Sequence, residues 1–286
     1  MVARANFQEI HEGRGTDKWW VWLDISHKSK KYILERLPKM HSMILKYNNV
    51  DISKDPVEIS PTTHYTMWGI WFDPKTYETT LKNFFVAGEC TMWVHGANRL
   101  WGNSLMETMV FWKNVAQRIL DTFENIAPDN SDEVVHISPV CEGTLDANGT
   151  LTEIRKEVWE YAWIVRTEEE LLKLTQILSE YRIKIQKEWI KCSWDEYTNT
   201  MMHNRIHTVL DFAELICKWA LERKESRGAH YRLDYPEMDE RFARNYLHQV
   251  CDGKIVSTWK DVPAPSSELQ YGLDTFEEPN NYGHQE

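Results

Sequence analysis

Three long stretches of helical periodicity, at residues 151–162, 167–189 and 193–223, constrain the fold most strongly. The last stretch carries apolar residues at every third or fourth position: Met202, Ile206, Val209, Ala213, Ile216 and Ala220. A helix with such a stripe is stable when the stripe is buried against a neighbour. Short connections between successive helices favour antiparallel packing. The sequence therefore predicts an antiparallel helical bundle whose core contains this stripe.

The chain before the bundle alternates between predicted helices and strands. Helices are expected at 4–12 and 28–47, and Pro38 should kink the second, whose inner face would be Ile33, Leu37, Met40 and Ile44. Strands are expected in VWLDIS (21–26) and in the apolar run within 81–89, and residues 50–63 should be extended.

A further long helix is predicted to start at Asn103 or Ser104, either of which is a favourable N-cap. Its inner side would consist of Leu105, Met109, Trp112 and Val115. Residues 126–150 are expected to form an acidic loop, and GKIVSTW (253–259) a strand in an otherwise irregular tail.

Composition excludes several classes of protein. The net charge of −11 argues against a nucleic-acid-binding protein, so an anionic substrate would need a local cationic pocket. The five cysteines are far apart and form no CxxC pair, which favours reduced thiols over disulfides or a metal site. No apolar run approaches the roughly 18 residues that span a bilayer, and MVARANFQEI is not a signal peptide.

The sequence contains no GxGxxG fingerprint. A dinucleotide cofactor normally needs such glycines, beside a helix N-terminus, to hold its pyrophosphate. By itself the chain therefore lacks the usual cradle for a dinucleotide.

Four segments nevertheless form a specific set in a fixed order. They are EGRG (12–15), HYTMWG (64–69), GECTMWVHGANRLWGNSLMETMVFW (88–112) and ESRGAHYRLDYP (225–236). Together they resemble the succinate dehydrogenase and fumarate reductase flavoprotein family, and weaker agreement fills the gaps between them. The resemblance places Met1 inside the family's capping domain, so the chain is similar to the C-terminal portion of a complete flavoprotein.

The fold that the resemblance implies is an α+β fragment. Residues 1–60 would complete a capping domain, and 61–125 would be the C-terminal part of a Rossmann-like FAD domain. Residues 126–250 would form the antiparallel helical domain and 251–286 an irregular tail. The late motif at 225–236 is expected to be structural and to pack the helical domain onto the flavin domain.

The implied activity is the interconversion of succinate and fumarate by hydride transfer with FAD. An iron–sulfur subunit would exchange the electrons, and the protein would be cytoplasmic and reach a membrane only through partner subunits. Such chemistry needs cations on two carboxylates and a proton donor. Arginine grips carboxylates in a bidentate manner. Arg99 and His64 suit this substrate-binding role, and the resemblance assigns Arg14 of EGRG to proton delivery.

Cofactor contacts are expected at Glu89, Ser104 and Leu105. An acidic residue at a strand end can accept hydrogen bonds from ribose hydroxyls, and the resemblance places Glu89 against FAD. The backbone N–H groups of Ser104 and Leu105, with the helix dipole, would stabilise negative charge on the reduced flavin. His95 is left open between a ligand and a buried, hydrogen-bonded histidine. Arg14 and Ser104, without the resemblance, would be a surface arginine and an ordinary helix cap.

Tryptophan stands where the family has glycine. The chain has 14 Trp and only 12 Gly, against the roughly 20 Gly expected from ordinary usage. The motif positions concerned are Trp20, Trp68, Trp93, Trp101, Trp112 and Trp163, with Trp19 and Trp219 as further candidates. One explanation is that UGA codons, read as glycine in the source, are written here as tryptophan; the other is a decayed or engineered gene. As written, these indoles should crowd the flavin pocket or turn into solvent.

Two alternative functions remain open. L-Aspartate oxidase shares the HYTM and HGANR segments, although AHYR and the GKIVSTW tail favour the dehydrogenase. A non-catalytic remnant or assembly module is compatible with the missing cradle, and the chain by itself is expected to be inactive.

Overall fold

Helices and strands both occur in the computed structural model, which describes residues 2–92, 94–100, 102–123, 143–188, 196–251, 254–267, 270, 271 and 275. Two units can be separated, Met1–Glu237 and Met238–Glu286. The mixture of helices and strands agrees with the predicted class. Among the described helices, none is both long enough and apolar enough to cross a membrane.

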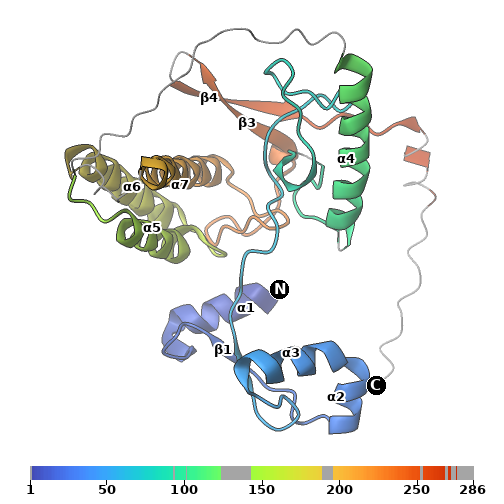
Figure 1. Cartoon of the computed structure of the whole chain (residues 1–286), viewed down its shortest axis with the longest axis vertical. Coiled ribbons are helices and arrows are strands. Elements are labelled where there is room, and N and C mark those ends of the chain that lie inside the picture. Colours follow the sequence, from blue (N-terminus) through green and yellow to red (C-terminus); the bar gives the residue numbers. More distant parts are fainter. Residues whose placement is uncertain are drawn as a thin grey trace. The chain divides into compact units, whose positions relative to one another are not determined.

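The predicted bundle is present as α5 (Ala147–Ala162), α6 (Glu168–Glu188) and α7 (Glu196–Glu222), which pack against one another (Figure 1). Asp146 caps α5 by accepting a hydrogen bond from the N–H of Asn148 at 3.1 Å. Every residue of the predicted α7 stripe is buried in the bundle core or packed against it. The prediction is confirmed because helical periodicity alone determines which α7 residues share a face.

The N-terminal segment contains α1 (Val2–Glu9), the π-helical turn η1 (Ile10–Arg14) and two short antiparallel strands, β1 (Val21–Leu23) and β2 (Val57–Ile59). Between the strands lie α2 (Lys30–Arg36) and α3 (Pro38–Asn48). Pro38 therefore ends one helix and begins another. The predicted inner face is only half right: Ile33 is buried and Ile44 packs beside it, whereas Leu37 and Met40 are exposed because the break at Leu37 turns α3.

The predicted strand at 81–89 is wrong. This segment forms a single bridge, between Glu78 and Phe85, followed by the 3-10 turn η2 (Gly88–Cys90). Leu81 and Phe84 are exposed, while Val86 is buried. Within the described residues this apolar run pairs only through that bridge, and it therefore lies mainly in a loop.

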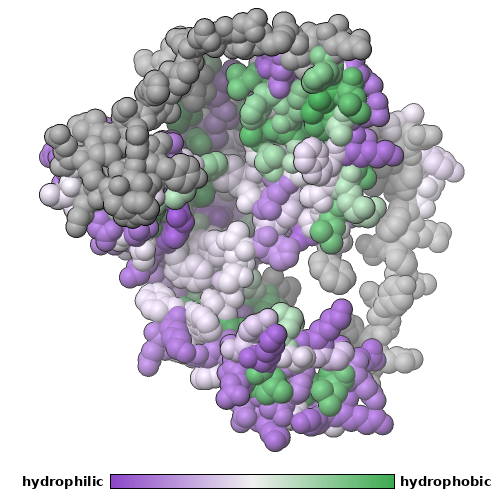
Figure 2. All heavy atoms as spheres, in the orientation of Figure 1, coloured by the Kyte–Doolittle hydropathy of each residue, from purple (hydrophilic) through white to green (hydrophobic). Residues whose placement is uncertain are grey.

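Helix α4 (Asn103–Thr122) begins where the sequence predicts, but its cap and buried face differ. The N-cap is Gly102, and no side chain caps the helix. The exposed fractions of Leu105, Met109 and Trp112 are 74%, 73% and 65%, so three of the four predicted inner residues face outward. Figure 2 shows hydrophobic side chains gathered over α4.

The inner side of α4 consists of Val115, as predicted, together with the buried Glu107 and the partly buried Phe111. Phe111 packs edge-on against Phe72 and Tyr77, at ring distances of 6.3 and 5.5 Å. Helical periodicity permits either of two apolar faces, and this aromatic contact from residues 72–77 selects the second.

The second unit contains the 3-10 turn η4 (Glu240–Phe242) and a hairpin of β3 (Arg244–Cys251) and β4 (Lys254–Asp261). The strand predicted at GKIVSTW is confirmed as β4, so this part of the tail is regular. Strand β3, which was not predicted, lies in the range assigned to the helical domain. The four domain bounds remain a prediction.

Candidate functional site

Two of the motif segments come together through a short parallel bridge. Ile70 pairs with Thr91: the N–H of Ile70 donates to the Cys90 carbonyl at 2.7 Å, and the N–H of Met92 donates to the Ile70 carbonyl at 3.0 Å. The N–H of Thr66 also donates to Oε1 of Glu89 at 2.8 Å. Residues of HYTMWG therefore lie directly beside the GEC turn that leads into the HGANR segment.

Beneath this junction lies a buried hydrogen-bond network centred on Glu107. Tyr65 donates its hydroxyl to Oε2 of Glu107 at 2.5 Å, and Nε2 of His95 lies 3.0 Å from the same oxygen. Oγ1 of Thr91 lies 3.1 Å from Oε1. Only 6% of Glu107 is exposed. Burial, followed by the hydrogen bond to Glu107, raises the pKa of Tyr65 above its ordinary value.

The role left open for His95 is therefore decided in favour of a buried, hydrogen-bonded histidine. Its side chain is 7% exposed, and its Nε2 faces both Glu107 and the Tyr65 hydroxyl, 3.1 Å away. Sequence reasoning missed Glu107 because the inner face predicted for this helix did not include it.

Arg99 contacts this network through the ring of Tyr65. The carbon of its guanidinium is 5.0 Å from the centre of the Tyr65 ring, within the range of a cation–π contact. Its Nε atom is buried and has no hydrogen-bond partner among the described residues. A buried N–H without a partner is costly, so Arg99 retains a donor that a ligand carboxylate would satisfy.

The N-terminus of α4 follows Arg99 closely in the chain. Gly102, with a φ of +87°, turns the backbone into the helix. The first-turn N–H groups, including those of Ser104 and Leu105, receive no side-chain cap. Leu100 and Leu105 are highly exposed beside them.

These features fit the ring of a flavin. Leu100 and Leu105 offer an apolar surface for a flat ring, and the uncapped helix N-terminus favours an anionic edge. The fit concerns the ring end of FAD alone, because the chain carries no glycine fingerprint for the pyrophosphate.

The remaining predicted site residues are less closely tied to this centre. Glu89 is exposed and uses one carboxylate oxygen on Thr66. His64, next to Tyr65 in the chain, is exposed. Arg14 lies in η1 and forms ion pairs with Glu9 and Glu12, each at 2.5 Å. Hydrogen bonds to these carboxylates raise the pKa of Arg14 further. No hydrogen bond or ion pair joins Arg14 to Arg99 or His64 among the described residues.

The motif at 225–236 packs against the HGANR turn, as predicted for a structural segment. The N–H of Ala229 donates to the Ala97 carbonyl at 3.1 Å, and Gly228 adopts a φ of +60° at this contact. Arg232 and Glu225, in the same motif, are completely buried. The late motif therefore supports the turn that carries Arg99.

The tryptophans at motif glycine positions are accommodated in different ways. Trp112 faces solvent, as expected, and Trp68 is partly exposed and stacks on Trp219 with ring centres 6.3 Å apart. Nε1 of Trp163 is buried and has no partner among the described residues. Trp19 adopts a φ of +64°, which bulky residues rarely do. Trp93 and Trp101 lie outside the described residues, so crowding of the flavin pocket there stays a prediction.

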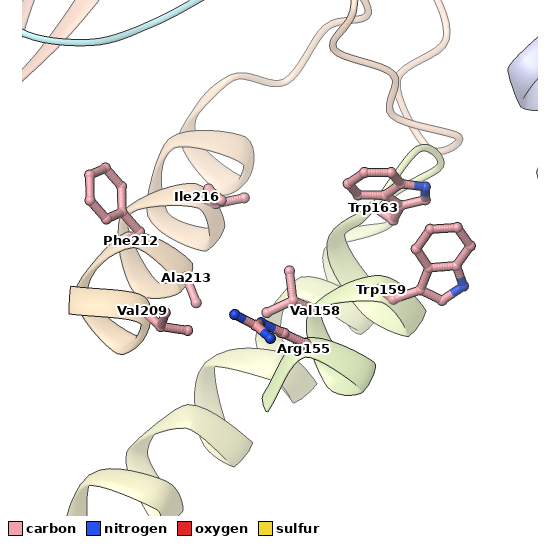
Figure 3. Close-up of a pocket in the computed structure, with 8 residues that line it drawn as sticks. All are labelled: Arg155, Val158, Trp159, Trp163, Val209, Phe212, Ala213 and Ile216. Carbon is pink, nitrogen blue, oxygen red and sulfur yellow. The ribbon is translucent and has the colours of Figure 1, made fainter. Parts of the chain in front are cut away.

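A pocket between α5 and α7, partly lined by Trp163, is separate from the predicted site residues (Figure 3). Its lining is apolar except for one arginine and consists of Arg155, Val158, Trp159, Trp163, Val209, Phe212, Ala213 and Ile216. None of the predicted site residues lines it. An apolar pocket with a single cation does not match a ligand that carries two carboxylates.

Two family profiles match the chain. The one described as fumarate reductase flavoprotein C-term matches residues 151–267, and the one described as FAD binding domain matches residues 1–105. The two matches cover the bundle with the hairpin, and the motif segments up to the start of α4.

Three curated relatives are similar along most of the chain. An uncharacterized FAD-dependent oxidoreductase of Methanocaldococcus jannaschii is 35% identical over 253 residues, covering 86% of this chain and 46% of that protein. A fumarate reductase (CoM/CoB) subunit of Methanothermobacter marburgensis is 33% identical over 257 residues, covering 86% and 46%. L-Aspartate oxidase of Acinetobacter baylyi is 30% identical over 234 residues, covering 79% and 41%. The chain spans less than half the length of each.

Solved structures agree in fold. The structure of Mycobacterium smegmatis Sdh1 in complex with UQ1 superposes with a TM-score of 0.82 and 30% identity, covering 96% of this chain and 48% of that one. This chain therefore has the fold of about half of that flavoprotein chain.

Proposed function

Because the chain belongs to the succinate dehydrogenase and fumarate reductase flavoproteins, a family whose cofactor is FAD, we propose that it supplies the dicarboxylate-binding part of an enzyme that interconverts succinate and fumarate. Residues 61–125 would belong to a Rossmann-like FAD domain and residues 1–60 to a capping domain. An iron–sulfur subunit is the proposed electron partner, and attachment to a membrane would come only through partner subunits.

The observation that carries this proposal is the state of Arg99. Its guanidinium is stacked on Tyr65, while its Nε–H is buried and unpaired among the described residues. A carboxylate can accept two parallel hydrogen bonds from such a fork. Arg99 therefore binds one carboxylate of the substrate, and the exposed His64, next to the supporting Tyr65, is assigned to the other.

The other residues have complementary roles. FAD, when bound, supplies the electron pair that is exchanged with the dicarboxylate. The N–H groups of Ser104 and Leu105 would hold the edge of its ring, and Glu89 would accept from a cofactor hydroxyl. Arg14 is assigned to proton delivery, with Glu9 and Glu12 as the carboxylates that hold its guanidinium in place.

L-Aspartate oxidation is the second candidate. The chain is 30% identical to the Acinetobacter baylyi L-aspartate oxidase, close to its identity with the Methanothermobacter marburgensis fumarate reductase protein. L-Aspartate is also a C4 dicarboxylate, so the Arg99 observation supports either substrate. Turnover of L-aspartate with neither succinate oxidation nor fumarate reduction would select this second function.

The test replaces Arg99 in the flavin-loaded enzyme of which this chain is a part, and measures fumarate binding by calorimetry. Loss of a charge-assisted bond costs about 1.5–3 kcal/mol, so Arg99→Ala should raise the Kd about 10- to 100-fold. The matched control is Arg36→Ala, which removes an exposed arginine at the end of α2. An unchanged Kd for Arg99→Ala, or an equal loss in both variants, would contradict the proposal.

A further inference from the structure

We propose that Glu107 is a positioning residue for the substrate-binding arginine. In this inference, which rests on the proposed function, the Glu107 carboxylate fixes the ring of Tyr65, and the ring in turn holds the guanidinium of Arg99 ready for a dicarboxylate.

The Glu107 carboxylate is held in a fixed position. Glu107 is on the second turn of α4 and is almost completely buried. The side chains of Tyr65, His95 and Thr91 all lie within 3.1 Å of its two oxygens. These contacts come from two separate segments, so Glu107 joins HYTMWG, the HGANR turn and α4 at a single point.

The hydrogen bond to Glu107 affects both the orientation and the ring charge of Tyr65. Its hydroxyl donates to Glu107 at 2.5 Å, and this bond anchors the hydroxyl end of the ring, which sets the direction of the ring axis. Donation to a carboxylate also shifts electron density from the O–H bond into the phenol oxygen and ring, which makes the ring face more negative. The attraction of a cation to an aromatic face is electrostatic, so the bond strengthens the hold of Tyr65 on Arg99.

Glu107 leaves the Nε–H donor of Arg99 free for a ligand. No ion pair or hydrogen bond links Glu107 to Arg99 within the described part of the chain, and the Nε–H of Arg99 stays unpaired there. A direct ion pair would occupy the donors that the substrate needs. With the Tyr65 ring as intermediary, the carboxylate stabilises the nearby cation without competing with the ligand.

A purely structural role explains this arrangement less well. Burying a carboxylate is unfavourable unless it is fully hydrogen-bonded, and apolar residues of similar volume often stabilise a fold equally well. Glu107 has two ionisable partners. Tyr65 contacts Arg99 directly, and His95 lies four residues before Arg99 on the same turn. The network therefore organises the substrate arginine.

The experiment compares Glu107→Gln with Asp121→Asn in the flavin-loaded enzyme. Asp121 is the other carboxylate of α4, is exposed, and accepts a hydrogen bond from Gln117. Calorimetry with fumarate should show a Kd about 5- to 10-fold higher for Glu107→Gln and unchanged for Asp121→Asn. Steady-state kinetics should show the same rise in KM with kcat within about twofold. Tyr65→Phe removes the same bond, should act in the same direction, and decides the question if Glu107→Gln does not fold.

The decisive measurement repeats Glu107→Gln in the Arg99→Ala background. A residue that acts through Arg99 should have no further effect there, whereas a structural residue should weaken binding again. A normal Kd in the single variants, or a second loss in the double variant, overturns the inference.

Failure of the proposed function can be distinguished from failure of the inference about Glu107. If the wild type binds L-aspartate but not fumarate, the function is wrong, and the same comparison with L-aspartate still decides the role of Glu107. If the wild type binds neither, both ideas are refuted.

Discussion

Gly228 offers a sharp test of how the late motif supports the turn that carries Arg99. Its φ is +60°, and a Cβ added there would lie 2.2 Å from the carbonyl oxygen of Ala97 and 2.8 Å from the Cβ of Ala97. The neighbouring N–H of Ala229 donates to that same carbonyl at 3.1 Å. Gly228→Ala should therefore push the two backbones apart and break this hydrogen bond.

The expected cost has three parts. A left-handed conformation costs an L-residue about 1–2 kcal/mol, relief of the overlap about 1–3 kcal/mol, and the lost hydrogen bond about 1 kcal/mol. The free energy of unfolding should thus fall by about 3–6 kcal/mol. Gly96→Ala is the matched control, since Gly96 has a φ of +55° but nothing within 4 Å of an added Cβ. Gly96→Ala should lower the free energy of unfolding only by the cost of the left-handed conformation, about 1–2 kcal/mol.

Thermal unfolding of both variants measures the difference. At about 2–4 °C per kcal/mol for a chain of this size, Gly228→Ala should melt at least about 4 °C below Gly96→Ala. Fumarate binding should weaken as well in Gly228→Ala, because Ala97 lies two residues before Arg99. Equal melting temperatures for the two variants would show that the Ala97 contact yields without cost and would refute the reasoning.

Four further predictions concern other parts of the chain. Burial, followed by the Arg166 guanidinium, lowers the pKa of His230 from 6.5 to about 3; the unfolded chain then binds the extra proton first, so stability should fall as pH drops below about 6.5, by about 2 kcal/mol at pH 5. Chemical denaturation at pH 7 and pH 5 checks this, and His230→Asn should flatten the dependence. Arg14→Gln should abolish turnover but leave flavin bound, as read from activity and flavin absorbance; normal fumarate reduction would remove its role. Trp19→Gly should raise the unfolding free energy by about 1–2 kcal/mol by relieving a φ of +64°. If UGA means glycine in the source, peptide mass spectrometry of native protein will show glycine at Trp20, Trp68, Trp93, Trp101, Trp112 and Trp163, whereas tryptophan at most of these would favour a decayed or engineered gene.

Local patterns predicted the helices well. The α7 stripe is buried as expected, and Pro38 separates α2 from α3 as its missing N–H requires. The motif segments also identified the family and the start of α4. These successes share one cause: periodicity, proline and motif order are properties of residues close together in the chain.

The failures required knowledge of distant neighbours. The run at 81–89 has strand composition, but within the described residues it pairs only through the bridge of Phe85 with Glu78, so it lies mainly in a loop. The bulky face of α4 is exposed, because Phe72 and Tyr77 pack on the other side against Phe111. Neither outcome can be derived from the segment itself.

The sequence by itself determined the bundle, the family and the residue types that can grip a dicarboxylate. Only the tertiary structure decided that Glu107, which the predicted inner face of α4 did not include, gathers Tyr65, His95 and Thr91 beneath Arg99. The physical reason is that a buried charge is stable only where distant segments supply its hydrogen bonds. Those partners, up to 42 residues away in the chain, are brought within reach by packing and not by local periodicity.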